Sequence, residues 1–159
     1  MLKDDTVTKD QLGDFICFEN YDQVPGFVVS QTAYTIRKTI ARRFKKQRID
    51  LTPHEFALLN RLAIHQKLNQ KQLAEMTYKD RPAVTRMLHR LIDRGFVEKE
   101  VNQRDRRAFL VTLTATGKKV RNLAVPIAQG VLVEGLKGVS REDLLVTLAT
   151  LKQITANIK

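Results

Sequence analysis

Residues 80–95 read DRPAVTRMLHRLIDRG, and this stretch decides the fold. Asp80 can cap a helix that runs from Arg81 to Arg94 and that Gly95 ends. Four apolar side chains share one side of this helix and are expected to be buried: Val84, Leu88, Leu91 and Ile92. The opposite side is polar and carries Pro82, Arg86, His89, Arg90 and Asp93, with Thr85 at its edge. The pattern predicts an amphipathic helix that presents arginine and threonine outward.

A second short helix is expected just before this one. Residues 68–76 read LNQKQLAEM, in which Asn69 and Gln72 form a capping box. A break is expected at residues 77–79. Two short helices separated by a few residues are typical of a helix-turn-helix unit, whose second helix suits the major groove of DNA.

After Gly95 the hydrophobic period becomes two, as in a strand. Residues 96–101 and 108–113 predict two strands, and the basic loop NQRDRR (residues 102–107) joins them. The hairpin would serve as a wing beside the helix-turn-helix unit. Arginines at its tip suit a narrow minor groove with its negative potential: Arg104, Arg106 and Arg107. Asp105 is expected to fix a neighbouring arginine through an ion pair.

Upstream of this unit two helices are expected. Apolar residues share one face from Phe27 to about residue 47, and residues 37–48 carry seven basic side chains and no acid. Thr52, Pro53 and Glu55 then form a strong start, with a capping box, for a helix that ends near His65.

Downstream, Thr114 is expected to cap a long helix to about residue 136, with a kink at Pro126. Gly138 breaks this helix, and Ser140 with Asp143 begins the last one. Apolar side chains form a stripe along it: Leu144, Leu148, Leu151, Ile154 and Ile158.

The order and spacing of these motifs resemble the MarR family. The resemblance rests on LNQKQLA (68–74), DRPAVTRMLHRL (80–91), RGFV (94–97), DRR (105–107) and LTATGK (113–118). It covers about residue 25 to the C-terminus. It implies a mostly α fold with a small β-hairpin wing, built as a winged helix-turn-helix domain with N- and C-terminal dimerisation helices.

The resemblance also implies how the chain is divided and what it does. The divisions are an acidic arm (1–25), dimerisation helices (26–48 and 115–159) and a DNA-binding domain (49–114). The implied protein is a homodimer that regulates transcription, as a repressor, from a pseudo-palindromic site on double-stranded DNA. Its half-sites would lie about one helical turn, roughly 34–36 Å, apart.

The residues expected to contact DNA lie on three elements. The recognition helix supplies Arg81, Pro82, Thr85, Arg86, His89 and Arg90. The helix before it supplies Gln70 and Lys71, which would grip the backbone. The wing supplies Arg104, Arg106 and Arg107.

By the same resemblance, a small phenolic or aromatic ligand would bind between the dimer helices and the winged domain and release DNA. Tyr34, Arg37 and His65 are the candidates for that pocket. One branch of the family senses peroxide through an N-terminal cysteine, so redox sensing through Cys17 is an alternative. Acidic neighbours of Cys17 would raise its thiol pKa, which favours a small buried apolar residue instead.

Composition narrows the class of protein. The 159 residues carry a net charge of +11, yet residues 1–25 hold two lysines against six acids. A basic body with an acidic leader points to a polyanionic partner. The lone cysteine and the lack of a membrane-length apolar run predict a protein of the cytoplasm, associated with the nucleoid.

Other function classes remain open or are disfavoured. No nucleophile motif, phosphate loop or metal-ligand spacing is present, so the sequence predicts neither an enzyme, a metal site nor a cofactor. A winged helix that serves RNA or protein contacts, or that coats DNA without sequence preference, is the remaining alternative.

Overall fold

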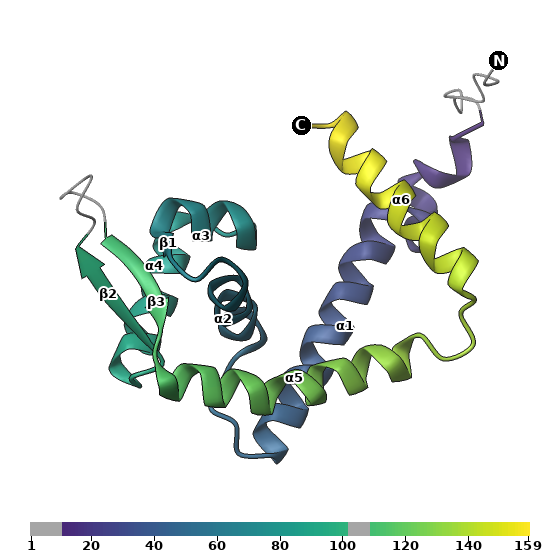
Figure 1. Cartoon of the computed structure of the whole chain (residues 1–159). Helices are drawn as coiled ribbons and strands as arrows, with labels where there is room; N and C mark the ends of the chain where they lie inside the picture. Colours follow the sequence, from purple (N-terminus) through teal and green to yellow (C-terminus); the bar gives the residue numbers. More distant parts are fainter. Residues whose placement is uncertain (1–10, 102–108) are drawn as a thin grey trace.

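One long helix joins two parts of the molecule, a winged part and a pair of helices near the two termini (Figure 1). The computed structural model describes residues 11–101 and 109–159. The N-terminal part holds the 3-10 turns η1 (Gly13–Phe15) and η2 (Phe18–Gln23), followed by α1 (Pro25–Lys46). The winged part holds α2 (Pro53–His65), β1 (Leu68–Asn69), α3 (Gln70–Thr77), α4 (Arg81–Asp93), β2 (Val97–Val101) and β3 (Phe109–Leu113). The chain then forms α5 (Ala115–Gly135) and α6 (Arg141–Asn157).

Side-chain caps start most of these helices where the sequence predicts. Thr52 and Glu55 form a capping box on α2, and Asn69 and Gln72 form one on α3. Thr114 and Ser140 cap α5 and α6 in the same way, each accepting a backbone N–H three residues on. The exception is α1, which begins at Pro25, two residues earlier than predicted. Proline suits the first turn of a helix because that turn leaves its N–H groups unpaired.

The sheet has one strand more than the predicted hairpin. Its order is β1-β3-β2, and both pairings are antiparallel. In β2 and β3, Val97 lies opposite Leu113 and Val101 opposite Phe109. The two-residue strand β1 pairs Leu68 with Val111, and it ties the start of α3 to the middle of β3. The residues expected at the wing tip, 102–107, lie outside the described part.

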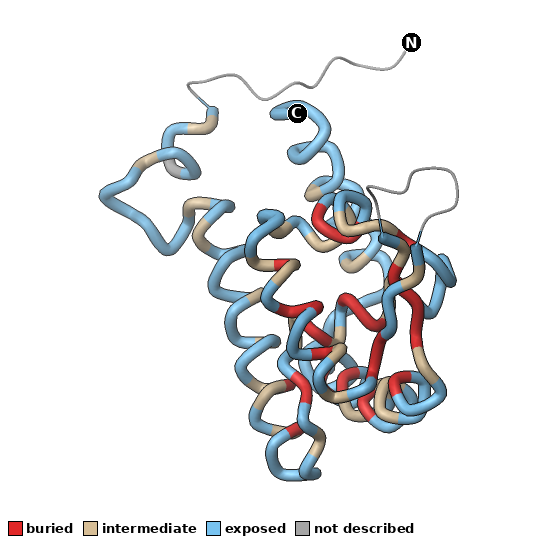
Figure 2. Tube along the Cα trace, turned by 90° about the vertical axis from the view of Figure 1, so that its left-hand side faces the viewer, coloured by how far each residue is buried: buried red, intermediate tan, exposed pale blue. Residues whose placement is uncertain are grey.

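The core lies in the winged part, where α2, α3 and α4 pack with the sheet. Figure 2 shows the buried residues gathered there. Leu58, Leu59, Leu73, Val84 and Leu91 are fully buried. The α1 helix joins this core through its C-terminal end, because Phe44 is fully buried and meets Phe56 edge-on at 5.5 Å. Burial of these side chains provides most of the stabilisation of the winged part.

The start of α5 is held tightly against the turn between α4 and β2. Thr114 donates its hydroxyl to the carbonyl of Gly95 at 2.6 Å, and its N–H donates to the carbonyl of Phe96 at 3.2 Å. Gly117 lies so close to the same carbonyl that a Cβ there would be 1.9 Å from the Phe96 oxygen. The glycine of the LTATGK motif is therefore a packing requirement.

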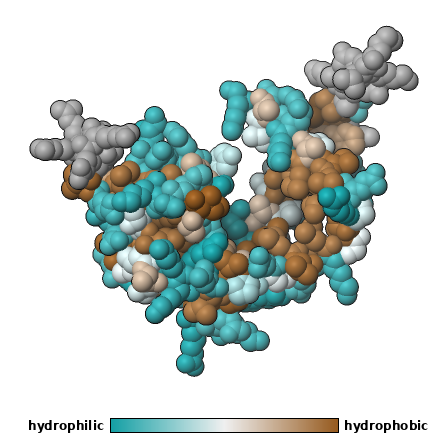
Figure 3. Space-filling model, viewed as in Figure 1, coloured by the Kyte–Doolittle hydropathy of each residue, from teal (hydrophilic) through white to brown (hydrophobic). Residues whose placement is uncertain are grey.

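The last helix is poorly covered by the rest of the described chain. No residue of α6 is buried. Its exposed side chains include four large apolar ones: Leu145, Val146, Leu148 and Ile154. Further exposed apolar side chains lie at the N-terminal end of α1 and the C-terminal end of α5: Val28, Val29, Leu132, Val133 and Leu136. Figure 3 shows this apolar surface over α1, α5 and α6. Helix α5 itself continues through Pro126 as one helix.

Candidate nucleic-acid interface

Helix α4 has one buried and one exposed side, as its sequence predicts. Val84, Leu88 and Leu91 are buried, and Met87 joins them, whereas Ile92 is only half-buried. On the other side Arg81, Pro82, Arg86, His89 and Arg90 are exposed and Thr85 is half-buried. The fold thus gathers the six polar or exposed candidates of this helix on a single face.

The first turn of α4 depends on Asp80. Its carboxylate accepts the backbone N–H of Ala83 at 2.6 Å, and Pro82 occupies the first turn. We expect Asp80→Ala to lower the free energy of unfolding by about 1 kcal/mol, since the N–H loses its partner. Asp80→Asn keeps an oxygen acceptor and is expected to stay within a few tenths of a kcal/mol of the native protein. Urea unfolding followed by circular dichroism measures both; equal losses would contradict the capping role.

Two of the predicted DNA contacts bind each other. The side-chain amide of Gln70, at the start of α3, donates to the hydroxyl oxygen of Thr85 on α4. The Thr85 hydroxyl donates in turn to the carbonyl of Arg81 at 2.9 Å. The methyl group of Thr85 is then the part of this side chain that is free of hydrogen bonds. Lys71 is exposed beside Gln70 and lies 3.9 Å from Glu75.

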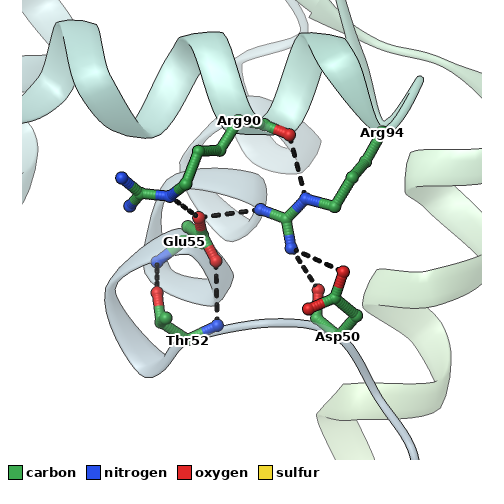
Figure 4. A network of polar contacts seen from close by, with 5 residues as sticks. All are labelled: Asp50, Thr52, Glu55, Arg90 and Arg94. Carbon is green, nitrogen blue, oxygen red and sulfur yellow. Dashed lines mark hydrogen bonds and ion pairs between the residues drawn. The ribbon is translucent and has the colours of Figure 1, made fainter.

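A buried carboxylate links α2 to the last turn of α4 (Figure 4). Glu55 is 1% exposed, and one of its oxygens accepts Arg90 Nε at 2.9 Å and Arg94 Nη2 at 2.7 Å. The other oxygen accepts the N–H of Thr52 at 2.9 Å. Sequence reasoning found the capping box but missed the two arginines, because they come from a helix about 35 residues away.

Charge and hydrogen bonds keep Glu55 ionised. Burial raises its pKa, but the Thr52 N–H, the Arg90 hydrogen bond and the Arg94 charge together lower the pKa below its ordinary value. A carboxylate whose pKa is lowered by folding stabilises the fold above its unfolded pKa. That contribution is lost as the pH falls through the lowered pKa.

The other candidates lie apart from this face. Arg104, Arg106 and Arg107 are outside the described residues. Tyr34 is 58% exposed on α1, with Lys38 Nζ 5.5 Å from its ring, and Arg37 is exposed nearby on the same helix. His65 is exposed at the C-terminal end of α2.

His54 lies in the first turn of α2. Burial, Lys79 and Arg37 lower the pKa of His54. Cys17 is half-buried and precedes η2. Nothing in the sequence around His54 points to this environment, since the two charges come from α1 and from the turn after α3.

Comparison with known proteins identifies the fold family. A sequence profile described as "MarR family" matches residues 49–108. The transcriptional regulator HosA of Escherichia coli is 33% identical over 101 residues, which are 64% of this chain and 75% of HosA. The chain belongs to the MarR family. Its winged helix-turn-helix fold, mostly helical with a small antiparallel sheet, is the one that the sequence predicts.

Further MarR relatives agree with this assignment. The organic hydroperoxide resistance transcriptional regulator of Bacillus subtilis is 28% identical over 113 residues, 70% of this chain and 76% of that protein. A mutant of MarR from E. coli, solved in complex with operator DNA, has a TM-score of 0.76 at 22% identity, and the match covers 84% of this chain and 96% of that protein.

Within residues 11–101 and 109–159, every helix is too short or too polar to span a lipid bilayer.

Proposed function

We propose that this MarR-family regulator binds a specific double-stranded DNA site as a homodimer and represses transcription, a non-enzymatic role at the chromosome in the cytoplasm. The exposed face of α4 is the observation that carries the proposal. It presents Arg81, Arg86 and Arg90 from a helix that is capped at its start and packed on its other side. Arginine on such a helix can pair bidentately with guanine in the major groove. The relative solved with operator DNA supports the same use of the fold.

Arg86 is the side chain that we expect to read a base. It is exposed on α4, and no described residue forms a hydrogen bond or ion pair with it. Arg86→Ala should cost about 1–3 kcal/mol of binding free energy on the preferred site and little on other duplexes. Fluorescence anisotropy at fixed salt measures both, with a duplex selected by the protein from a random library and a scrambled duplex of equal length.

Lys137, which is exposed in the turn after α5, provides the matched control. Lys137→Ala removes one positive charge without touching α4, so its effect should be small on both duplexes. A loss from Arg86→Ala that is equal on both duplexes would assign Arg86 to a phosphate. Equal, weak binding of the native protein to both duplexes would contradict a sequence-specific repressor and favour an architectural or RNA-binding role.

The second copy of this chain is the partner that we propose for α6. A helix with no buried residue and several exposed leucine, valine and isoleucine side chains is not stable alone in water. The apolar ends of α1 and α5 would extend the same interface. A two-fold dimer places its two α4 helices on half-sites related by the same symmetry, so the site should be pseudo-palindromic.

Release by a small phenolic or aromatic ligand completes the proposed function. The ligand would lie between α1 and the winged part, with Tyr34 and Arg37 on one side. His65 remains the histidine candidate for this pocket, and His54, whose pKa the Arg37 charge lowers, is a further one on the same helix. The ligand shifts the equilibrium between DNA-bound and free protein only if it binds the free protein more tightly. The ligand then weakens DNA binding by the same factor by which DNA weakens ligand binding.

Thiol-based sensing through Cys17 is a second candidate because of the Bacillus subtilis relative, whose name refers to organic hydroperoxide resistance. The half-buried position of Cys17 before η2 also suits a packing role. DNA binding that is unchanged by an organic hydroperoxide would exclude the redox function.

A further inference from the structure

Glu55 does two separate jobs, one with each carboxylate oxygen. Oε2 accepts the backbone N–H of Thr52 and completes the capping box of α2. Oε1 accepts one N–H from Arg90 and one from Arg94, both in the last turns of α4 or just after it. Glu55 is the buried charged side chain of the described residues, so this contact replaces the water that a carboxylate otherwise binds.

The capping box alone does not require a charge. Glutamine reaches back to the N-cap N–H as well as glutamate does. Glutamine has one acceptor oxygen, however, and its NH₂ group would face the two guanidinium groups, which only donate. A carboxylate at residue 55 is therefore matched to Arg90 and Arg94 rather than to the start of α2.

The two arginines use this carboxylate differently. Arg94 is 22% exposed, and its groups are all engaged: Nη2 binds Glu55, Nη1 binds the Asp50 carbonyl at 2.5 Å and Nε binds the Arg90 carbonyl at 2.9 Å. Arg90 is 52% exposed and binds Glu55 through Nε alone. Figure 4 shows the two terminal nitrogens of Arg90 on the side of the guanidinium group away from the network.

We propose that Glu55 is a positioning residue that holds Arg90 ready to bind a DNA phosphate at the C-terminal end of α4. The inference rests on the proposed DNA-binding function of that helix. A guanidinium group fixed at Nε still offers the N–H groups of Nη1 and Nη2 to a phosphate. Because the side chain is already ordered, less rotamer freedom is lost when DNA binds.

The sign of one substitution separates positioning from simple electrostatics. Glu55→Gln removes a negative charge close to the interface, so long-range attraction alone would tighten DNA binding. If Glu55 positions Arg90, the same change weakens binding, by about tenfold, because the phosphate contact is lost. The dependence of log Kd on log salt should also fall by about one per protomer.

The test is a double-mutant cycle on the full chain with Glu55→Gln, Arg90→Ala and the double variant. Anisotropy titrations over a salt series use the selected and the scrambled duplex. We expect the two single variants to lose the same factor on both duplexes, since a phosphate carries no sequence, and the double variant to match Arg90→Ala. Arg90→Lys should lose less than Arg90→Ala but still bind more weakly than the native protein, because an ammonium group keeps the charge and lacks the planar fork that binds Glu55 and a phosphate together.

Stability is measured alongside binding, since Glu55→Gln also weakens the contact with Arg94. Circular dichroism melts define a temperature at which every variant is folded, and the titrations are run below it. Binding by Glu55→Gln that is unchanged or tighter overturns the inference, as do losses that multiply in the double variant. If the native protein fails to distinguish the two duplexes, the proposed function fails instead, and that result is seen before any variant is made.

Discussion

Replacing Gly117 by alanine is expected to lower the free energy of unfolding by about 3 kcal/mol, the upper end for forcing extra atoms into a packed site. The added Cβ would lie 1.9 Å from the carbonyl oxygen of Phe96, which belongs to the backbone and is held by Thr114. Neither backbone can move without breaking the contact between α5 and the turn after α4. Thermal unfolding at one protein concentration should show a melting temperature lower by roughly 6–12 °C.

Gly130 is the matched control, because it lies on the same helix. A Cβ there would meet only Arg43 Nη1, at an ordinary 3.8 Å. Gly130→Ala should therefore be neutral or raise the stability by up to about 1 kcal/mol, as alanine does within helices. If Gly117→Ala unfolds at the same temperature as Gly130→Ala, the close approach to Phe96 does not limit this site.

Placing two glutamates on α6 is expected to separate the proposed dimer. Leu148 and Ile154 are 45% and 42% exposed and lie outside the core, so Leu148→Glu with Ile154→Glu should leave the winged part of each protomer folded but charge the interface. Loss of the second protomer makes DNA binding univalent, and the affinity should fall by roughly 100-fold or more. Sedimentation velocity measures the oligomeric state, and anisotropy on the selected duplex measures binding.

Thr150→Glu tests whether charge on α6 is enough to explain that loss. Thr150 is an exposed polar residue of the same helix, and its hydroxyl donates only to the carbonyl of Val146. This variant should stay dimeric and bind DNA normally. A double glutamate variant that also stays dimeric would show that α6 is not the interface, and the exposed ends of α1 and α5 would then have to supply it.

Local chemistry explains why so much of this fold was predictable. Helices α2 to α6 each begin after a capping side chain that accepts the backbone N–H three residues later. These hydrogen bonds are local, so they can be predicted without knowing the tertiary contacts. The hairpin strands were predicted within one residue of their ends. The MarR motifs lie at the same places in the structure: caps, the end of α4 and the Gly117 contact.

Features that depend on distant partners were missed. Strand β1 is two residues long and forms only because β3, about 40 residues later, offers a free edge. The apolar face predicted for α4 left out Met87, which is buried, and Ile92 packs against the core but is only half-buried, because the neighbouring helices decide which side is covered. The sequence predicts Glu55 in a capping box, but its hydrogen bonds with Arg90 and Arg94 form only when α2 packs against α4. No sequence signal placed His54 near Arg37.

The single helix α5 connects the winged part to α6, and its length has a mechanical consequence. At 1.5 Å per residue, its 21 residues span about 30 Å. The contacts of Thr114 and Gly117 with Gly95 and Phe96 fix one end of α5 to the winged part. A rotation of about 5° about this fixed end would therefore move the far end of α5 by roughly 3 Å. That displacement is a large fraction of the rise between successive base pairs of DNA. In the proposed dimer, small rearrangements near α6 would thus change the spacing of the two α4 helices, with no change inside either winged part.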